Sequence, residues 1–294
     1  MSNAQAPAAV RPGLRLEHAA LLTPTRRRAV RDGVAIAGVL AALVAGVMSF
    51  NGAAIDAHAY WVNRPPVSYG PLAGTDDAYL YSPAFAQLLA PVTALPWHAF
   101  LALWLAGLLL ALRWLTGPLL LLPAVVLFFA EISYANIHFL LALAMVVGFR
   151  HPSAWSLVLL TKITPGIGLV WFAARREWRS LAIAAGASAA IAAFSFVLAP
   201  GSWLGWIDLL ERSAAVPPPT VLLPGPLWLR LAVAGAIVAW GARTDRPWVV
   251  PVAAVVALPH GTIGIAMLVA VIPLLRGSRF SPPRLSSQRP AMAG

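Results

Sequence analysis

Residues 26–50 read RRRAVRDGVAIAGVLAALVAGVMSF, a pattern typical of a membrane anchor. A basic cluster is followed by 18 residues without a charge, Gly33–Phe50. A run of this length suffices for a tilted or slightly short span. No cleavage motif of small residues follows it, so we expect a retained anchor rather than a signal peptide. Residues 1–32 are then expected to form a cytoplasmic tail.

The composition extends this interpretation to the whole chain. Of the 294 residues, 60% are hydrophobic and 11% are charged, whereas soluble domains carry about 25% charged residues. This excludes a soluble enzyme, a collagen and a disordered chain. The absence of cysteine excludes thiol catalysis, iron–sulfur ligation and disulfides. The net charge of +11 indicates topology rather than nucleic-acid binding, because the basic residues lie between apolar stretches.

Charged residues divide the chain into eight candidate spans of an all-α polytopic protein, which we expect in the plasma membrane. With both termini in the cytoplasm, most arginines lie inside and only Arg64 and Arg212 lie in outer loops, as the positive-inside rule requires. Six of the ten acidic residues fall outside: Asp56, Asp76, Asp77, Glu131, Asp208 and Glu211. The predicted spans are Gly33–Phe50, Trp97–Leu112, Gly117–Ala130, Ala135–Phe149, Leu181–Leu198, Leu222–Trp240, Trp248–Leu258 and Thr262–Leu275.

Two segments do not fit simple spans. Between Arg150 and Arg175 lie 24 residues, about 36 Å of helix, which cannot cross a core of about 30 Å twice. Both flanks are basic, so we predict a broken or re-entrant hairpin with Lys162 at its apex. The uncharged run from Ala78 to Leu112 is too long for one span, and its prolines indicate a short helix, Ser82–Leu95, in the outer leaflet.

Two outer segments complete a single transmembrane domain over residues 33–276. Residues 51–79 form a loop long enough to suggest a binding function. Within residues 200–220, helical spacing of Trp203, Trp206, Ile207 and Leu210 predicts an interfacial amphipathic helix, which Pro217–Pro219 should end. Residues 277–294 are expected to be a disordered cytoplasmic tail.

Several motifs, taken in order, resemble glycosyltransferase family 87. They are NGAAIDAHAYW (51–61), YLYSPAFAQLLAPVTALPW (79–97), SYANIHFLLALAM (133–145), LVLLTKITPGIGLV (157–170) and AARREWR (173–179). The resemblance covers about Gly33–Arg179, and the later spans agree mainly in hydropathy. It implies a GT-C-like bundle of about eight transmembrane helices, with one or two broken helices and the interfacial helix.

The resemblance also implies an enzyme without a cofactor or metal. It would move a sugar, mannose above others, from a polyprenyl-phosphate donor to a lipid-linked or cell-envelope glycan acceptor at the outer membrane face. Such a transfer needs a base for the acceptor hydroxyl and a cation for the departing phosphate. We assign Asp56 as the base of an inverting reaction. The expected substrate-binding residues are Lys162, His260, His58, Tyr81 and Arg64.

Each candidate also has a structural interpretation. Asp56 can be a solvated loop carboxylate, Lys162 a cap on a broken helix, and His260 a histidine of an exposed turn. Asp76 and Asp77 can bind a metal or simply cap a turn, while Glu131 is expected to lie at the membrane interface. Two other functions remain open: a transporter of small solutes or lipids, and a non-catalytic scaffold subunit of an envelope-assembly complex.

Overall fold

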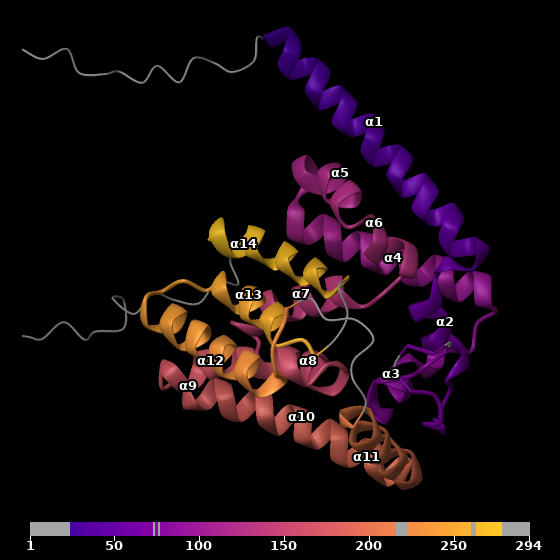
Figure 1. The fold of residues 1–294 in the computed structure, drawn as a ribbon, viewed down its shortest axis with the longest axis vertical. Helices are drawn as coiled ribbons and strands as arrows, with labels where there is room; N and C mark the ends of the chain where they lie inside the picture. Colours follow the sequence, from indigo (N-terminus) through magenta and orange to yellow (C-terminus); the bar gives the residue numbers. More distant parts are fainter. Residues whose placement is uncertain (1–23, 73, 76, 216–222, 260–262, 278–294) are drawn as a thin grey trace, which may run out of the picture.

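The computed structural model describes residues 24–72, 74–75, 77–215, 223–259 and 263–277. Every regular element in these ranges is helical (Figure 1), which confirms the predicted all-α class. The α-helices are α1 (Pro24–Met48), α2 (Ile55–Val62), α3 (Pro83–Thr93), α4 (Trp97–Thr116), α5 (Pro118–Leu127), α6 (Phe129–Tyr134), α7 (His138–Gly148), α8 (Trp155–Thr161), α9 (Val170–Ala174), α10 (Trp178–Leu198), α11 (Pro200–Ala214), α12 (Leu227–Arg243), α13 (Val249–Val256) and α14 (Val271–Leu275). A π-helical turn, η1 (Ser49–Ala53), and three 3-10 helices, η2 (Pro152–Ala154), η3 (Thr164–Leu169) and η4 (Ile263–Ala270), complete the described elements.

Three helices of the described chain are long and apolar enough to cross a membrane: Arg27–Ala53, Trp97–Thr116 and Trp178–Leu198. The eight predicted spans therefore do not correspond to eight uninterrupted helices. The predicted span Gly117–Ala130 is divided between α5 and α6, and the predicted span Thr262–Leu275 between η4 and α14. A proline lies within one helix of each divided span, Pro123 in α5 and Pro273 in α14, and each removes a backbone donor from its helix.

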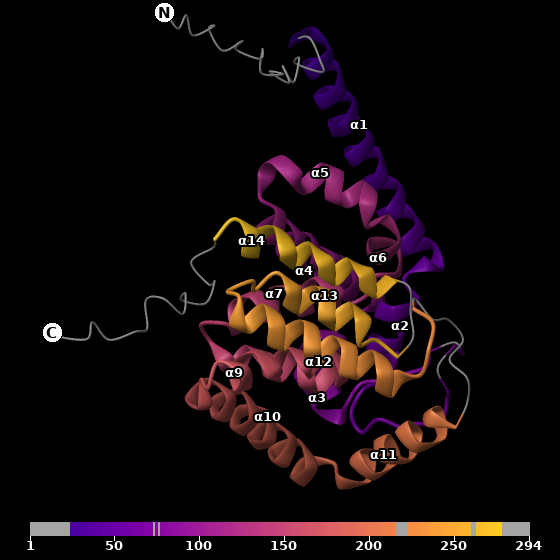
Figure 2. The ribbon, with the colours of Figure 1, turned by 60° about the vertical axis from the view of Figure 1, so that its left-hand side comes forward.

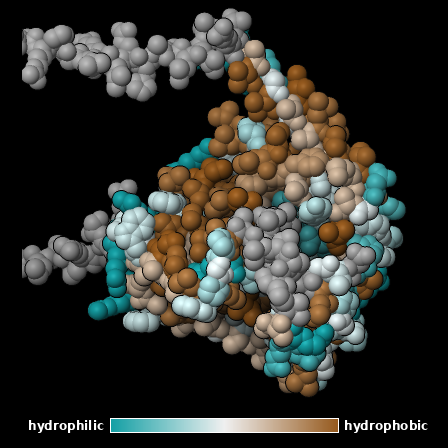
Figure 3. Space-filling view, viewed as in Figure 1, coloured by the Kyte–Doolittle hydropathy of each residue, from teal (hydrophilic) through white to brown (hydrophobic). Residues whose placement is uncertain are grey.

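Helix α1 extends beyond the rest of the molecule (Figures 1 and 2). It begins at Pro24, nine residues before the predicted span. Ile36, Leu43 and Val47 are each more than 60% exposed, and apolar surface also covers the neighbouring helices (Figure 3). Exposed apolar area of this extent is typical of a surface that faces lipid. The helix packs closely on α5 at Gly38. Leu122 lies so near that a side chain at position 38 would collide with it.

Helix α7 forms the centre of the bundle. It contacts α4, α8, α13 and η4. Its side chains Phe139, Leu141, Ala142, Met145 and Val146 are completely buried. Burial on all sides makes α7 a rigid support for the residues at its N-terminal end.

The hairpin predicted between Arg150 and Arg175 is present, and it breaks where expected. Helix α8 ends at Thr161, and Lys162 has an extended backbone (φ −129°, ψ 101°) before η3 begins. A side chain at Gly166 would collide with Leu159, and one at Gly168 with Trp155. These pairings show that the two arms run antiparallel. That the apex lies within a membrane remains a prediction.

Helices α3 and α11 confirm two further predicted elements. Helix α3 begins with Pro83 at its first turn, where proline costs no hydrogen bond. In α11, Trp206 and Leu209 are buried against the protein, whereas Ile207 and Leu210 are exposed. The apolar face of α11 therefore divides into a part that packs on the protein and a part that is left exposed, and its place at a membrane interface stays a prediction. The predicted stop at Pro217–Pro219 lies outside the described residues.

The segment predicted as the long outer loop, residues 51–79, contains helix α2. The sequence offered no strong signal for so short a helix. The predicted tails, 1–32 and 277–294, lie almost entirely outside the described residues, except that α1 occupies residues 24–32.

Candidate active site

Helix α2 carries Asp56 in its first turn. The chain leaves α1 through η1, where Gly52 has φ +100°, a conformation that favours glycine. Ser49 fixes this turn, because its hydroxyl lies 2.8 Å from the carbonyl oxygen of Ala45 and 2.9 Å from that of Ser133. Asp56 is half-buried and lies one helical turn before Tyr60, so both side chains project from the same face of α2.

The break in the hairpin brings Lys162 to the same region. Two residues before Lys162, the carbonyl of Leu160 accepts hydrogen bonds from the hydroxyl and the backbone N–H of Ser82. The Tyr81–Ser82 segment is thereby attached to the hairpin apex. The Lys162 ammonium nitrogen lies 5.7 Å from the centroid of the Tyr81 ring, a cation–π contact.

The turn between α6 and α7 supplies the third group of polar residues. Ala135 has the left-handed conformation (φ 53°) and its carbonyl accepts the Trp104 indole N–H at 2.8 Å. The side-chain oxygen of Asn136 accepts the backbone N–H of Ile137 at 2.7 Å. One Glu131 oxygen accepts the backbone N–H of His138 at 2.8 Å, so this carboxylate satisfies a free donor at the start of α7.

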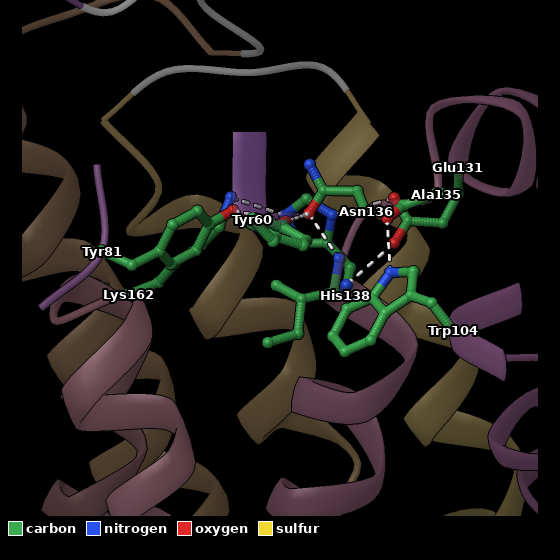
Figure 4. Close-up of polar contacts among 9 residues, drawn as sticks. Tyr60, Tyr81, Trp104, Glu131, Ala135, Asn136, His138 and Lys162 are labelled. Atoms are coloured by element: carbon green, nitrogen blue, oxygen red, sulfur yellow. Dashed lines mark hydrogen bonds and ion pairs between the residues drawn. The ribbon is translucent and has the colours of Figure 1, made fainter. Parts of the chain in front are cut away.

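Figure 4 shows Tyr60, Tyr81, Glu131, Asn136, His138 and Lys162 gathered in one polar cluster. Asp56 joins this group through a hydrogen bond from Asn136. Glu131 Oε2 lies 2.9 Å from His138 Nδ1, and His138 Nε2 lies 3.0 Å from Lys162 Nζ. The Tyr60 and Tyr81 hydroxyls are 2.9 Å apart. Tyr60 also donates to the Asn136 side-chain oxygen at 3.5 Å. We call the set Asp56, Tyr60, Tyr81, Glu131, Asn136, His138 and Lys162 the polar cluster.

The environment of Asp56 makes its carboxyl group a stronger base than an exposed aspartate. Burial raises the pKa of Asp56 above its ordinary value. The Lys162 ammonium, a hydrogen bond from Asn136 and His138 act in the opposite direction, and Glu131 adds to the rise. Burial also raises the pKa of Tyr60 and Tyr81, so both phenols remain neutral hydrogen-bonding groups.

The structure brings together three of the residues predicted for the site: Asp56, Lys162 and Tyr81. His58 instead points to another set of side chains, with Nδ1 2.6 Å from Asp77 and its ring against Trp97. Arg64 is exposed and lies over the Trp61 ring. Of the predicted residues, His260 lies outside the described part of the chain. Its neighbours Leu258 and Pro259 accept hydrogen bonds from the buried Arg230 guanidinium.

His138, Asn136 and Tyr60 were not predicted as site residues, and for Glu131 a place in the cavity was only the alternative to one at the membrane interface. Glu131 was expected at the membrane interface, but it is 2% exposed and paired with His138, so that expectation was wrong. Asn136 and His138 were seen only as parts of a motif. The sequence does contain one signal, an acidic residue seven positions before a histidine that starts a helix. This spacing brings the two side chains together only because the chain turns at Ala135.

A metal site at Asp76 and Asp77 was one of the alternatives that the sequence left open. In the ranges that the structure covers, no group of three or more His, Asp or Glu residues has the arrangement of a metal site. Asp76 of the Asp76–Asp77 pair lies outside these ranges, so the structure does not test that pair.

Comparison with known families gives a match to the model of glycosyltransferase family 87 over residues 79–287, which is more than two thirds of the chain. The match includes Tyr81, Glu131, Asn136, His138 and Lys162. It extends much further toward the C-terminus than the resemblance expected over 33–179, and it begins after Asp56. No curated protein and no solved structure matches the chain.

Proposed function

The chain belongs to glycosyltransferase family 87, and from this premise we propose that it transfers mannose from a polyprenyl-phosphate donor to an acceptor hydroxyl. The acceptor is a lipid-linked or cell-envelope glycan at the outer face of the plasma membrane. The reaction inverts the anomeric centre in one displacement and uses no cofactor.

One observation carries the proposal: the polar cluster places a basic carboxylate and an ammonium group together. Asp56 takes the proton of the acceptor hydroxyl as the oxygen bonds to the anomeric carbon. The bond from that carbon to the phosphate oxygen breaks, and the polyprenyl phosphate leaves with the electron pair. Lys162 stabilises the negative charge that develops on the phosphate.

Asp56 is the better candidate for the base than the second carboxylate of the cluster, Glu131. Both oxygens of Glu131 already accept hydrogen bonds from His138, and its side chain is 1% exposed. Asp56 is half-buried and close enough to Lys162 for the two charges to interact, so one substrate can meet both groups.

The arrangement of α1 supports an outward-facing site. Its 25 residues extend about 37 Å, enough to cross the hydrocarbon core. The basic residues Arg27, Arg28 and Arg31 lie at its first turns, and α2 follows its other end. With the basic end in the cytoplasm, Asp56 faces outward. The exposed apolar helices then offer the donor's isoprenoid chain a lipid-side approach.

The test is a transfer assay with purified protein in detergent. We expect sugar transfer from synthetic polyprenyl-phosphate-mannose and none from GDP-mannose. A transporter or a scaffold subunit would give no transfer with either donor. Activity with GDP-mannose alone would contradict the proposed donor class.

A further inference from the structure

The proposed reaction gives no role to the buried pair Glu131–His138, although His138 contacts Lys162. Glu131 is 2% and His138 is 1% exposed. A carboxylate and an imidazole buried to this extent are costly unless each is satisfied by hydrogen bonds. Their geometry therefore indicates what the pair does.

The hydrogen bonds show which atom of the pair donates and which accepts. Glu131 accepts from the backbone N–H of His138 and from Nδ1 of the same residue. Ionised carboxylates only accept, so the proton of the neutral imidazole is on Nδ1. Nε2 is left with a lone pair, and it lies 3.0 Å from Lys162 Nζ. An ammonium group only donates, so Lys162 donates to His138.

We propose that Glu131 and His138 position the Lys162 ammonium for the phosphate of the donor. Glu131 holds the imidazole in one orientation and one tautomer, and the imidazole holds the end of a flexible lysine side chain. One of the three ammonium hydrogens is used by His138, and the others remain for the phosphate. This inference rests on the proposed function, in which Lys162 binds the donor phosphate.

The neighbourhood of His138 supports a precise placement of the ring. Gly264, in η4, leaves no room for a side chain: one would collide with Leu258 and approach His138 Nε2 to 3.4 Å. The N-terminus of α7 is fixed by the rigid packing of that helix, and Lys162 follows α8, which also contacts α7. The two residues therefore sit on elements whose relative position is set by the core.

Two amide substitutions at position 138 separate the two contacts of the imidazole. The amide nitrogen in His138→Asn lies where Nδ1 was, so it can still donate to Glu131 but is too short to reach Lys162. The amide oxygen in His138→Gln extends to where Nε2 was and can accept from Lys162. A role in positioning Lys162 predicts that His138→Asn is the more impaired of the two.

The measurement is steady-state kinetics with polyprenyl-phosphate-mannose, with inhibition by polyprenyl phosphate as a second readout. For Lys162→Met, Glu131→Gln and His138→Asn we expect KM for the donor and the inhibition constant to rise about tenfold or more. The KM for the acceptor should stay close to that of the wild type. His138→Gln should recover most of the donor affinity. Melting temperatures in detergent show whether each variant is folded.

The results distinguish this inference from the proposed function. If the wild type transfers no sugar, or if Lys162→Met leaves the KM for the donor unchanged, the proposed function fails. If Lys162→Met raises that KM but folded His138→Asn and Glu131→Gln do not, only the positioning role fails. Equal losses in His138→Asn and His138→Gln that follow their melting temperatures would also overturn it, because they indicate a purely structural histidine.

Discussion

Two carboxylates belong to the polar cluster, and their surroundings give them different roles. Glu131 is enclosed and bound by two N–H groups of His138, so it remains a fixed acceptor. Asp56 keeps partial access to solvent, and burial raises its pKa. A carboxylate with a raised pKa takes up a proton more readily, which suits Asp56 to act as a base.

Replacing Asp56 by Asn should reduce the turnover number by ~100-fold or more, because the amide keeps the shape but cannot take a proton. Binding of polyprenyl phosphate should persist. The matched control is Asp208→Asn, which removes only an exposed carboxylate that pairs with Arg212 on α11 and should leave turnover near the wild-type value. If Asp56→Asn were active and Asp77→Asn were not, the base would belong to the turn at Asp77.

The pH dependence should report the same residue. Transfer requires ionised Asp56, so kcat/KM should fall as the pH drops through the pKa of Asp56, which lies above the ordinary value of an aspartate. The hydrogen bond from Asn136 lowers this pKa, so Asn136→Ala should raise it and move the acid limb of the profile to higher pH. Lys162, His138 and Glu131 also face Asp56 and remain in this variant.

Tyr60→Phe is the control for that shift. It removes the hydroxyl that contacts Asn136 but leaves the Asn136 amide beside Asp56. Its acid limb should coincide with that of the wild type. An unchanged profile in Asn136→Ala would show that Asp56 does not set the acid limb.

At the scale of elements, the hairpin between α7 and α10 was predictable and the polar cluster was only partly so. Simple length arithmetic between Arg150 and Arg175 requires a break, and the Thr-Lys-Ile-Thr-Pro stretch has the residues that end a helix. Glu131 and His138 meet for a different reason. Glu131 lies in the six-residue helix α6, and the left-handed Ala135 ends that helix and turns the chain before His138; no periodic pattern indicates such a turn.

The same limit applies to α2. Asp56 was correctly expected beside the first span, but which side chains share its face depends on a helix that the sequence does not signal. His58 and Arg64, close to Asp56 in sequence, therefore project from other faces of α2 or follow its end. Closeness to Asp56 along the chain was therefore a poor guide to the site. Asp56 itself was found by its place just after the first span, and Lys162 by the break that the short hairpin requires.

The packing of the hairpin depends on Trp155, which is completely buried between two glycines. A methyl group at Gly168 would collide with the Trp155 ring and reach Val250. Overpacking of this kind costs ~1–3 kcal/mol, so Gly168→Ala should lower the melting temperature in detergent. Gly186→Ala on the exposed face of α10 meets no atom and should be neutral or slightly stabilising. Equal melting temperatures would contradict this account of the packing.

At the scale of the whole molecule, the site lies where some helices end and others begin. Helix α1 reaches the site at its C-terminal end, whereas α7 starts there and leads away from it. The ten residues from Pro152 to Thr161 span about 15 Å of helix and return the chain from the turn at Arg150 to the site.

A site at the outer face predicts that two exposed serines lie on opposite sides of the membrane. Ser68 lies in the segment after α2, and Ser153 lies in the turn before α8; both are exposed. The chain contains no cysteine, so single Ser68→Cys and Ser153→Cys variants can be labelled without background. In intact cells an impermeant thiol reagent should modify Ser68→Cys at once. Ser153→Cys should react only after the membrane is permeabilised. The reverse pattern would place Asp56 on the cytoplasmic side, where a nucleotide-sugar donor becomes available and the proposed outer-face transfer no longer holds.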